Sequence, residues 1–204
     1  RKGDTLPDWF TMPTIAKYLK EIYPPLKDRG FTIFFTGLSG AGKTTLAKML
    51  MVKLIEHGKR RVTLLDGDIV RTHLSNELGF SKEHRSINVQ RIGYVASEIT
   101  KNGGIAICAP IAPYEADRIK NRQLISQYGI YIEIYLSTPL EVCEHRDIKG
   151  FYLRARHNLT PSFTGIDSPY EIPKNADIVL DTSTATAEDL TNKIYDKIKA
   201  MGCL

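Results

Sequence analysis

The chain has 204 residues, of which 42% are hydrophobic and 25% charged, and its formal net charge is +5. This composition is typical of one globular domain with its own core, and it excludes fibrous and disordered classes. Because its 28 basic and 23 acidic residues include no polybasic run, the charge favours a small anionic ligand over nucleic acid.

The cysteines and the apolar runs indicate the cellular setting. Cys108, Cys143 and Cys203 are odd in number and lack metal-like spacing, so we expect reduced, mostly buried thiols in a cytoplasmic protein. No apolar run approaches the ~20 residues of a membrane span, so no membrane partner is expected. No signal peptide is recognised either. The chain begins with Arg1 rather than Met, which indicates a processed piece of something longer.

Short apolar runs alternate with amphipathic segments beyond residue 30. Nearly continuous apolar strands separated by helices predict an α/β fold, a five-stranded parallel sheet with helices on both faces. In such sheets ligands bind at the carboxyl ends of the strands. The predicted strands are 31–35, 61–66, 105–110, 131–136 and 176–181, and the predicted helices are 43–57, 68–78, 83–101, 115–128, 139–146 and 186–200.

Two segments interrupt the alternation. Residues 1–30, with several prolines and Trp9, are predicted to form an N-terminal arm or linker ahead of a single domain at 31–204. Residues 147–173 form a long interval with basic, aromatic, glycine and proline residues. An interval of that length inside a compact α/β domain is usually functional, so it predicts a mobile lid.

The sequence GLSGAGKTTL, residues 37–46, lies between the first predicted strand and the first predicted helix of the sheet. It contains the pattern G-x-x-x-x-G-K-[ST], whose backbone N–H groups cradle phosphates while the lysine contacts the β- and γ-phosphates and the hydroxyl binds Mg²⁺. The fold is therefore predicted to be of the P-loop NTPase type. The residues predicted to hold the nucleotide are Gly37, Leu38, Ser39, Gly40, Ala41, Gly42, Lys43, Thr44 and Thr45, with Thr44 at the metal.

The second predicted strand ends in LLDGD, which places Asp66 and Asp68 beside the phosphate loop. Carboxylates there can orient Mg²⁺ or accept a proton from an attacking hydroxyl. No guanine-reading N/T-K-x-D and no apolar run ending in D-E is present, so a kinase is favoured over a GTPase switch or a motor ATPase. A structural alternative for Asp68 is capping of the helix that begins at IVRTHL.

Six residues outside the predicted strands could bind an acceptor. Arginines at neighbouring sites suit oxyanions, and phenylalanines in polar loops suit stacking on a flat ring. The set therefore indicates an anionic, ring-bearing acceptor, such as another nucleotide. Structural roles stay open, because Phe80 could fill the core beside a helix stop at Gly79 and the basic residues could be solvated. The six are Arg71, Phe80, Arg85, Asn88, Lys149 and Phe163.

Longer stretches resemble adenylylsulfate (APS) kinases. The matching stretches are FTGLSGAGKTTLA, LLDGDIVRTHLSNELGFSKEHRSINVQRIG, PIAPYEADR, STPLEVCEHRDIKGFYLRAR and FTGIDSPYE, in order across 31–204. The family transfers the γ-phosphoryl group of ATP to the ribose 3′-hydroxyl of APS with Mg²⁺, giving 3′-phosphoadenylyl sulfate (PAPS) and ADP in sulfate activation. The resemblance implies ATP and Mg²⁺ as cofactors, APS as substrate and a homodimer.

The resemblance also implies residue roles. Asp68 would be the base at the 3′-hydroxyl, supported by Asp66, and Lys149 would neutralise charge between the two nucleotides. Phe80 and Phe163 would sandwich the APS adenine. The residues implied in catalysis are Asp68, Lys43, Asp66 and Lys149; those flanking the ATP base are Arg146 and Arg156; those at APS are Asp68, Arg71, Phe80, Arg85, Asn88, Ile111, Ala112, Lys149 and Phe163.

Ala112 departs from the family pattern, in which many members have serine. Without a hydroxyl, no phosphoenzyme intermediate can form there, which favours direct in-line transfer by positioning and electrostatics. The alternatives are a regulatory domain that binds APS or PAPS, and a P-loop kinase for another small acceptor such as gluconate. The arm at 1–30 resembles the junction ahead of the kinase in bacterial fused ATP sulfurylase–APS kinase proteins, so a fused sulfurylase domain is an expected partner.

Overall fold

The computed structural model describes residues 9–22, 24–25, 28–58, 60–159 and 162–204. At its centre lies a sheet of five parallel strands in the order β2–β3–β1–β4–β5. The strands are β1 (Phe31–Thr36), β2 (Val62–Asp66), β3 (Ile105–Ala109), β4 (Ile130–Leu136) and β5 (Ile178–Leu180). Each overlaps a predicted strand, so the predicted sheet is confirmed.

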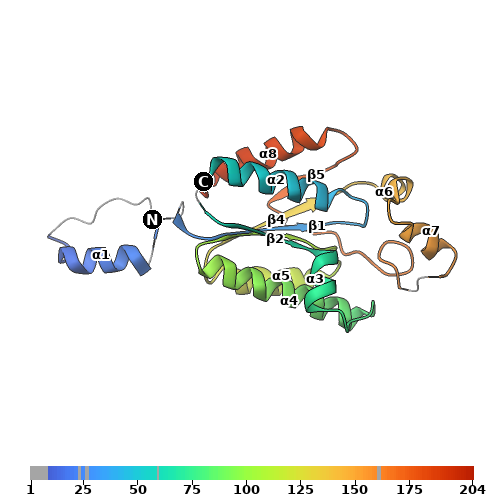
Figure 1. The fold of residues 1–204 in the computed structure, drawn as a ribbon, viewed down its shortest axis with the longest axis horizontal. Helices are drawn as coiled ribbons and strands as arrows, with labels where there is room; N and C mark the ends of the chain where they lie inside the picture. The colour runs from blue at the N-terminus through green and yellow to red at the C-terminus, as the bar shows by residue number, and fades with distance from the viewer. Residues whose placement is uncertain (1–8, 23, 26–27, 59, 160–161) are drawn as a thin grey trace.

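Helices cover both faces of the sheet (Figure 1). Helices α2 (Lys43–His57) and α8 (Ala187–Ala200) lie on one face, while α4 (Lys82–Lys101) and α5 (Glu115–Ile125) pack together on the other. Three short helices lie near the carboxyl ends of the strands: α3 (Gly67–Leu74), α6 (Leu140–Arg146) and α7 (Phe151–Arg156). This arrangement confirms the α/β fold of P-loop NTPase type.

The central strand β1 explains why the sheet has two cores. All of its residues are buried, and it pairs with β3 on one side and β4 on the other. Since successive side chains of a strand point to opposite faces, Ile33 and Phe35 enter the core under α2 and α8, whereas Phe34 enters the core under α4. A strand buried on both faces reads as a continuous apolar run, as FTIFF does.

Two segments contain helices that the pattern of alternation did not predict. Helix α1 (Pro13–Ile22) lies within the expected arm and stands apart from the sheet in Figure 1, while residues 1–8, 23 and 26–27 of that arm lie outside the described residues. Helix α7 lies within the expected lid, of which residues 160–161 are not described. The predicted helix at 68–78 ends earlier, at Leu74, and Ser75 is its C-cap.

Cys108, Cys143 and Cys203 are free and buried, as predicted. Within the described ranges, the helices are all too short or too polar to cross a bilayer.

Candidate active site

The phosphate loop, residues 37–44, connects β1 to α2 at the carboxyl edge of the sheet. Gly40 has a φ of 75°, and a Cβ there would lie 2.7 Å from the carbonyl oxygen of Cys143. Gly42 has a φ of 96° and is the residue before the first turn of α2. These two positions need glycine for conformation and, at Gly40, also for close packing. Left-handed glycines of this kind are what a loop needs for its backbone N–H groups to cradle a phosphate.

Lys43 is buried at the start of α2, with only 8% of its surface exposed. Its Nζ donates hydrogen bonds to the carbonyl oxygens of Gly37 at 2.9 Å and Leu38 at 2.6 Å. Burial lowers the pKa of Lys43 to about 8, although nearby acidic groups including Asp68 oppose this shift. Because both of its acceptors are neutral carbonyls, an anionic phosphate would be a better partner for the ammonium group.

Thr44 and Asp66 are joined by a 2.7 Å hydrogen bond from the threonine hydroxyl to Oδ2 of the carboxylate. Hydroxyl and carboxylate oxygens are the ligands that Mg²⁺ prefers, so this pair fits the predicted metal role of Thr44 and the expectation that a carboxylate after the second strand orients the metal. The other oxygen of Asp66, Oδ1, accepts from the backbone N–H of Asp68 at 3.1 Å. Asp66 is therefore the N-cap of α3, and the capping interpretation of Asp68 is wrong.

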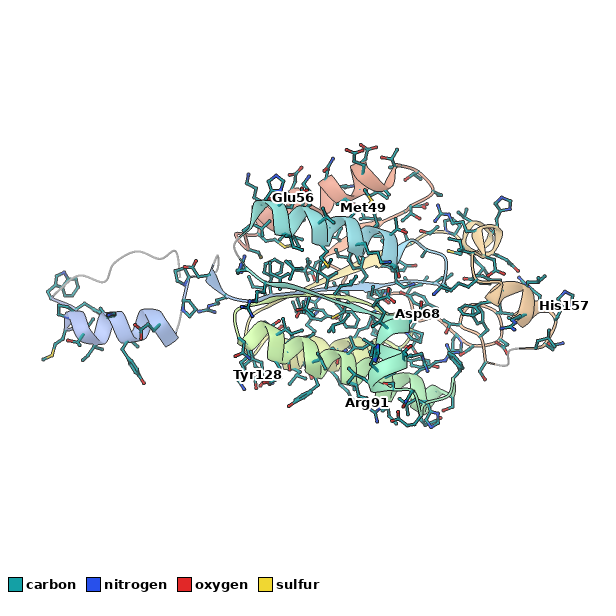
Figure 2. All side chains as sticks on the ribbon, viewed as in Figure 1. Met49, Glu56, Asp68, Arg91, Tyr128 and His157 are labelled. Carbon is teal, nitrogen blue, oxygen red and sulfur yellow. The ribbon has the colours of Figure 1, made fainter. Side chains whose placement is uncertain are left out.

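Asp68 lies in the first turn of α3 and forms an ion pair with Lys149, which follows α6 in the chain. Both side chains are about half exposed or more, at 63% and 51%. Figure 2 places Asp68 at the end of the sheet that faces α6 and α7. The carboxylate is thus free of helix capping, accessible, and paired with a cation from the expected lid.

Arg71 and Phe80 lie next to each other beyond Asp68. The Arg71 guanidinium lies 4.4 Å from the centre of the Phe80 ring, and it donates to the carbonyl oxygens of Leu78 and Gly79. Phe80 is 55% exposed, so the interpretation of Phe80 as a core-filling residue is wrong. An exposed ring beside a cation is a surface that can bind a flat anionic ligand.

Arg85 and Asn88 are buried near the start of α4. The guanidinium of Arg85 donates to the Phe80 carbonyl at 2.8 Å, the Thr164 hydroxyl and the Ser162 carbonyl. Arg85 is therefore not a solvated surface residue but connects α4 to the end of the expected lid. The side-chain oxygen of Asn88 has no hydrogen-bond partner among the described residues, so it can accept one from a ligand.

Phe163 does not share the exposure of Phe80. It is buried in the core, with its ring edge-on to Tyr152 at 5.0 Å and tilted against Phe151 at 6.3 Å. Among the described residues, none of the close aromatic pairs joins Phe163 to Phe80. The structure does not bring the two rings together, and their sandwich around adenine stays a prediction.

Ile111 and Ala112 form a turn after β3, beside the first glycine of the phosphate loop. The Ile111 carbonyl accepts from the Thr36 hydroxyl at 2.7 Å and from the Gly37 N–H at 3.4 Å. Ala112 is buried and has a φ of 46°, a left-handed conformation that residues other than glycine seldom adopt. The turn therefore lies where the phosphate loop meets the expected acceptor side.

Arg146 and Arg156 both contact protein groups in this structure. Arg146 donates to the Gly40 carbonyl at 3.3 Å and to the hydroxyl and carbonyl oxygens of Thr182 at 2.7 and 2.9 Å. Arg156 forms a two-point ion pair with Glu144, at 2.7 and 3.0 Å. Arg146 thus lies at the phosphate loop, and the contacts of Arg146 and Arg156 with the ATP base both stay predictions.

Sequence reasoning missed three residues that support the phosphate loop. The Tyr152 hydroxyl donates to the Ser39 carbonyl at 2.8 Å, and the Thr182 hydroxyl donates to the Ala41 carbonyl at 3.1 Å. Thr138 shares a 2.9 Å hydrogen bond with Thr182. Thr138 and Thr182 each lie two residues after a strand, so the carboxyl-edge rule could have found them. No comparable signal marks Tyr152.

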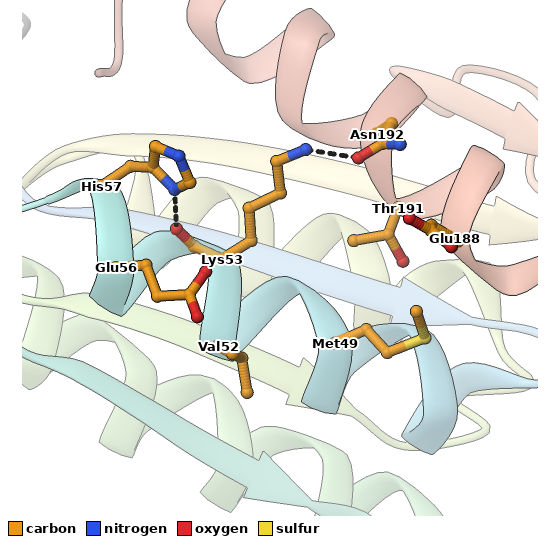
Figure 3. Close-up of a pocket in the computed structure, with 8 residues that line it drawn as sticks. All are labelled: Met49, Val52, Lys53, Glu56, His57, Glu188, Thr191 and Asn192. Atoms are coloured by element: carbon orange, nitrogen blue, oxygen red, sulfur yellow. Dashed lines mark hydrogen bonds between the residues drawn. The ribbon is translucent and has the colours of Figure 1, made fainter.

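Two hollows of the described structure differ in how they relate to these residues. One lies between α2 and α8, where Figure 3 shows side chains such as Lys53, His57 and Asn192, and none of the predicted site residues lines it. The other is lined by Leu38 of the phosphate loop together with residues that follow β4 and residues 165–170. Only the second therefore adjoins the candidate active site.

The sequence matches the family model of adenylylsulphate kinase over residues 29–181. A solved structure described as hexameric APS kinase from Thiobacillus denitrificans is 44% identical, has a TM-score of 0.81, and is matched over 100% of this chain and 36% of that chain. The APS kinase of Mycobacterium tuberculosis in complex with AMPPNP and APS is 38% identical, with a TM-score of 0.80, over 84% of this chain and 98% of that chain.

A curated relative from Aspergillus oryzae, named sulfate adenylyltransferase, is 46% identical over 202 residues, which are 99% of this chain and 35% of the relative. The chain thus spans about a third of the length of the curated relatives it matches.

Proposed function

The chain belongs to the adenylylsulfate kinase family, and we propose that it transfers the γ-phosphoryl group of ATP to the ribose 3′-hydroxyl of APS, giving PAPS and ADP. One observation carries this proposal: an accessible carboxylate, Asp68, lies two residues beyond Asp66, the carboxylate that contacts the phosphate-loop threonine. In a kinase, the group that accepts the proton of the acceptor hydroxyl must lie close to the site that holds the phosphates and Mg²⁺ of ATP.

ATP would bind with its phosphates in the cradle of the phosphate loop. Lys43 would exchange its carbonyl partners for the β- and γ-phosphates, an exchange favoured because the ammonium group is buried and lacks a directly bonded anion among the described residues. Tyr152, Thr182 and Arg146 contact carbonyl oxygens of the same loop, so they would hold it in shape during this exchange.

Mg²⁺ would be held by the Thr44 hydroxyl and the Asp66 carboxylate, and when bound it supplies neutralisation of charge on the transferring phosphates. Asp66 would also fix the first turn of α3, because its carboxylate caps that helix by accepting from the N–H of Asp68. One residue would therefore both hold the metal and orient Asp68.

APS would lie between α3, the start of α4 and the turn at Ile111 and Ala112. Phe80 and Arg71 offer a ring and a cation to the adenine and the phosphosulfate. The side-chain oxygen of Asn88, which no described residue bonds, offers an acceptor to a base N–H. Asp68 would accept the proton of the 3′-hydroxyl, and Lys149 would move from Asp68 to the charge between the nucleotides. The alanine at position 112 favours direct transfer without a phosphoenzyme.

Partners beyond the substrate are also part of this proposal. The relatives are about three times as long as this chain, and a fused sulfurylase domain would supply APS directly to the kinase. Assembly into a homodimer or a larger oligomer is proposed from the family and from the hexameric description of the Thiobacillus denitrificans protein.

The test is release of ADP by the purified chain with Mg²⁺–ATP and a panel of acceptors: APS, gluconate, shikimate and water. We expect release with APS alone, with PAPS formed in equal amount. Turnover with another acceptor would indicate a different small-molecule kinase.

A binding measurement by calorimetry separates the regulatory alternative. Tight binding of APS or PAPS without turnover would contradict the kinase proposal and indicate a nucleotide-sensing domain. Lys43→Met serves as the inactive control, because it removes the ammonium group and keeps an unbranched side chain in the loop.

A further inference from the structure

Arg118, in the first turn of α5, is 1% exposed and is among the largest fully buried side chains of the described residues. Burying an arginine is costly unless its charge is paired and its N–H groups have acceptors. It is not one of the residues expected to touch ATP or APS. Its partners, which lie in and behind the turn that follows β3, explain how the protein accommodates this buried charge.

The guanidinium of Arg118 reaches three separate segments. Nη1 donates to the carbonyl of Ala112 at 2.8 Å, and Nη2 donates to the carbonyl of Glu171 at 2.7 Å. Nε faces the carboxylate of Glu133 at 3.4 Å, which pairs the charge. The planar fork of an arginine can make such contacts at once, whereas a lysine ammonium cannot.

The segment that Arg118 holds is the acceptor turn, residues 110–113. Ala112 has a left-handed φ of 46°, and a non-glycine residue keeps such a conformation only when its surroundings impose it. The Thr36 hydroxyl contacts the carbonyls of Ile111 at 2.7 Å and Ala112 at 3.2 Å from the phosphate-loop side. The carbonyl of Ala112 is thus fixed between Thr36 and Arg118.

A second contact closes the turn from the other side. Glu171 donates its backbone N–H to the Pro113 carbonyl at 2.8 Å, and its side chain accepts from the Glu115 N–H at 2.6 Å. The Tyr170 hydroxyl shares a 2.8 Å hydrogen bond with Thr36. Since Thr36 directly precedes Gly37, one connected set of hydrogen bonds runs from Arg118 to the first glycine of the phosphate loop.

We propose that Arg118 is a positioning residue for phosphoryl transfer: by holding the acceptor turn, it sets the position of the acceptor relative to the phosphate loop. This inference rests on the proposed function. Because Arg118 is buried and bonded to protein groups, it would act on the geometry between the substrates and not on the chemistry of either. Small misplacements of reacting groups are costly in such reactions, because catalysis is mainly positioning.

Arg122 provides a matched control. It lies one turn further along α5 and faces the same Glu133 carboxylate, at 3.6 Å, and Asp177 at 2.7 Å. No hydrogen bond from Arg122 to the acceptor turn is present among the described residues. Arg118→Lys and Arg122→Lys therefore keep the same charge beside Glu133, and only the first removes the fork at Ala112 and Glu171.

The experiment measures kcat and KM for APS and for ATP, binding of AMPPNP alone, and Tm, in the wild type and both lysine variants. We expect Arg118→Lys to lower kcat/KM for APS by about tenfold or more, with AMPPNP binding within about twofold of wild type, because hydrogen bonds from charged groups are lost only at the turn. Arg122→Lys should stay within about twofold throughout. Equal values of kcat/KM for the two variants would overturn the proposal.

Should Arg118→Lys fail to fold, the double variant Arg118→Met with Glu133→Gln removes both buried charges at similar volume, a change that proteins often tolerate. It should fold and show the same loss of kcat/KM for APS, and wild-type activity would overturn the proposal.

Hydrogen exchange separates this inference from the proposed function. The amides of Gly37, Glu115 and Glu171 donate to groups of the acceptor turn or of Glu171, so they should exchange about tenfold faster in Arg118→Lys than in Arg122→Lys, whether or not the wild type turns over APS. No APS turnover by the wild type would sink the proposed function alone. Unchanged exchange in Arg118→Lys would sink the positioning role alone.

Discussion

The carboxylate of Asp68 forms an ion pair with the ammonium group of Lys149, 81 residues further along the chain. The pair joins the first turn of α3 to the segment between α6 and α7. Asp68 is free to make it because Asp66 caps α3 in its place. Two carboxylates that are two residues apart therefore have separate contacts: Asp66 caps the helix and binds Thr44, and Asp68 pairs with Lys149 and, in the proposed reaction, would face the acceptor.

Asp68→Asn tests the role of this carboxylate as a base. The change removes the proton acceptor but keeps the shape of the side chain, so kcat should fall by about two to four orders of magnitude. Tm should change little, because Asp68 is exposed and caps no helix. Steady-state ADP release and thermal unfolding check the two expectations, and an unchanged kcat would remove Asp68 from the mechanism.

The companion variant is Asp66→Ala. It removes the cap of α3 and the partner of Thr44 together, so it should destabilise the fold by about 1 kcal/mol as well as weaken the Mg²⁺ dependence of turnover. A variant pair with identical Tm values would contradict the assignment of the cap to Asp66.

Phe80 and Phe163 should respond differently to truncation. Phe80→Ala should raise KM for APS much more than KM for ATP and leave the stability nearly unchanged, since the ring is 55% exposed. Phe163→Ala should cost about 3–5 kcal/mol of unfolding free energy, because the ring is buried against Tyr152. Denaturant unfolding and the two KM values measure this difference. An equal effect of Phe80→Ala on both KM values would contradict stacking on APS.

The sequence predicted the sheet and the phosphate loop well because both have local signals. A continuous apolar run such as FTIFF is typical of a strand that is buried on both faces. The pattern G-x-x-x-x-G-K-[ST] contains glycines because the loop backbone must turn its N–H groups toward phosphates. The hydrogen-bond and ion-pair partners of a side chain often lie far from it in the sequence, so they have no such local signal. Nothing near Arg118 in the chain indicates that its acceptors lie at positions 112, 133 and 171.

The same limit explains the corrections at the site. The N-cap of α3 depended on where the helix begins, and a shift of one or two residues moved the cap from Asp68 to Asp66. The exposure of Phe80 and its contact with Arg71 depend on tertiary packing, which the spacing of the two residues does not specify.

Tyr152→Phe isolates the contact between the lid segment and the phosphate loop. It removes only the hydroxyl that donates to the Ser39 carbonyl and keeps the ring that packs on Phe163. ATP binding should weaken by roughly fivefold, the effect of one neutral hydrogen bond. APS binding measured in the absence of ATP should stay unchanged and serves as the internal control. Equal losses for both ligands would indicate a general loosening of the lid segment.

Lys43 should make nucleotide binding depend on pH. Burial lowers the pKa of Lys43 to about 8 in the free protein, so its charge is lost above that pH, whereas bound phosphates would favour the charged form. Affinity for AMPPNP should therefore be flat below about pH 7 and fall up to tenfold per pH unit above about pH 8. The stability of the fold changes with pH in the opposite direction. Because the pKa of Lys43 is lower in the folded chain than in the unfolded chain, its contribution to the unfolding free energy rises between about pH 8 and pH 10.

The Asp68→Asn variant tests whether Lys43 causes the pH dependence of AMPPNP binding. The Asp68 carboxylate raises the pKa of Lys43 against the effect of burial, so removing its charge should move the inflection in AMPPNP affinity to lower pH. Calorimetric titrations between about pH 6.5 and pH 9.5 would locate the inflection in both proteins. Lys43→Met should bind weakly and without an inflection. An inflection at the same pH in wild type and Asp68→Asn would assign it to a group other than Lys43.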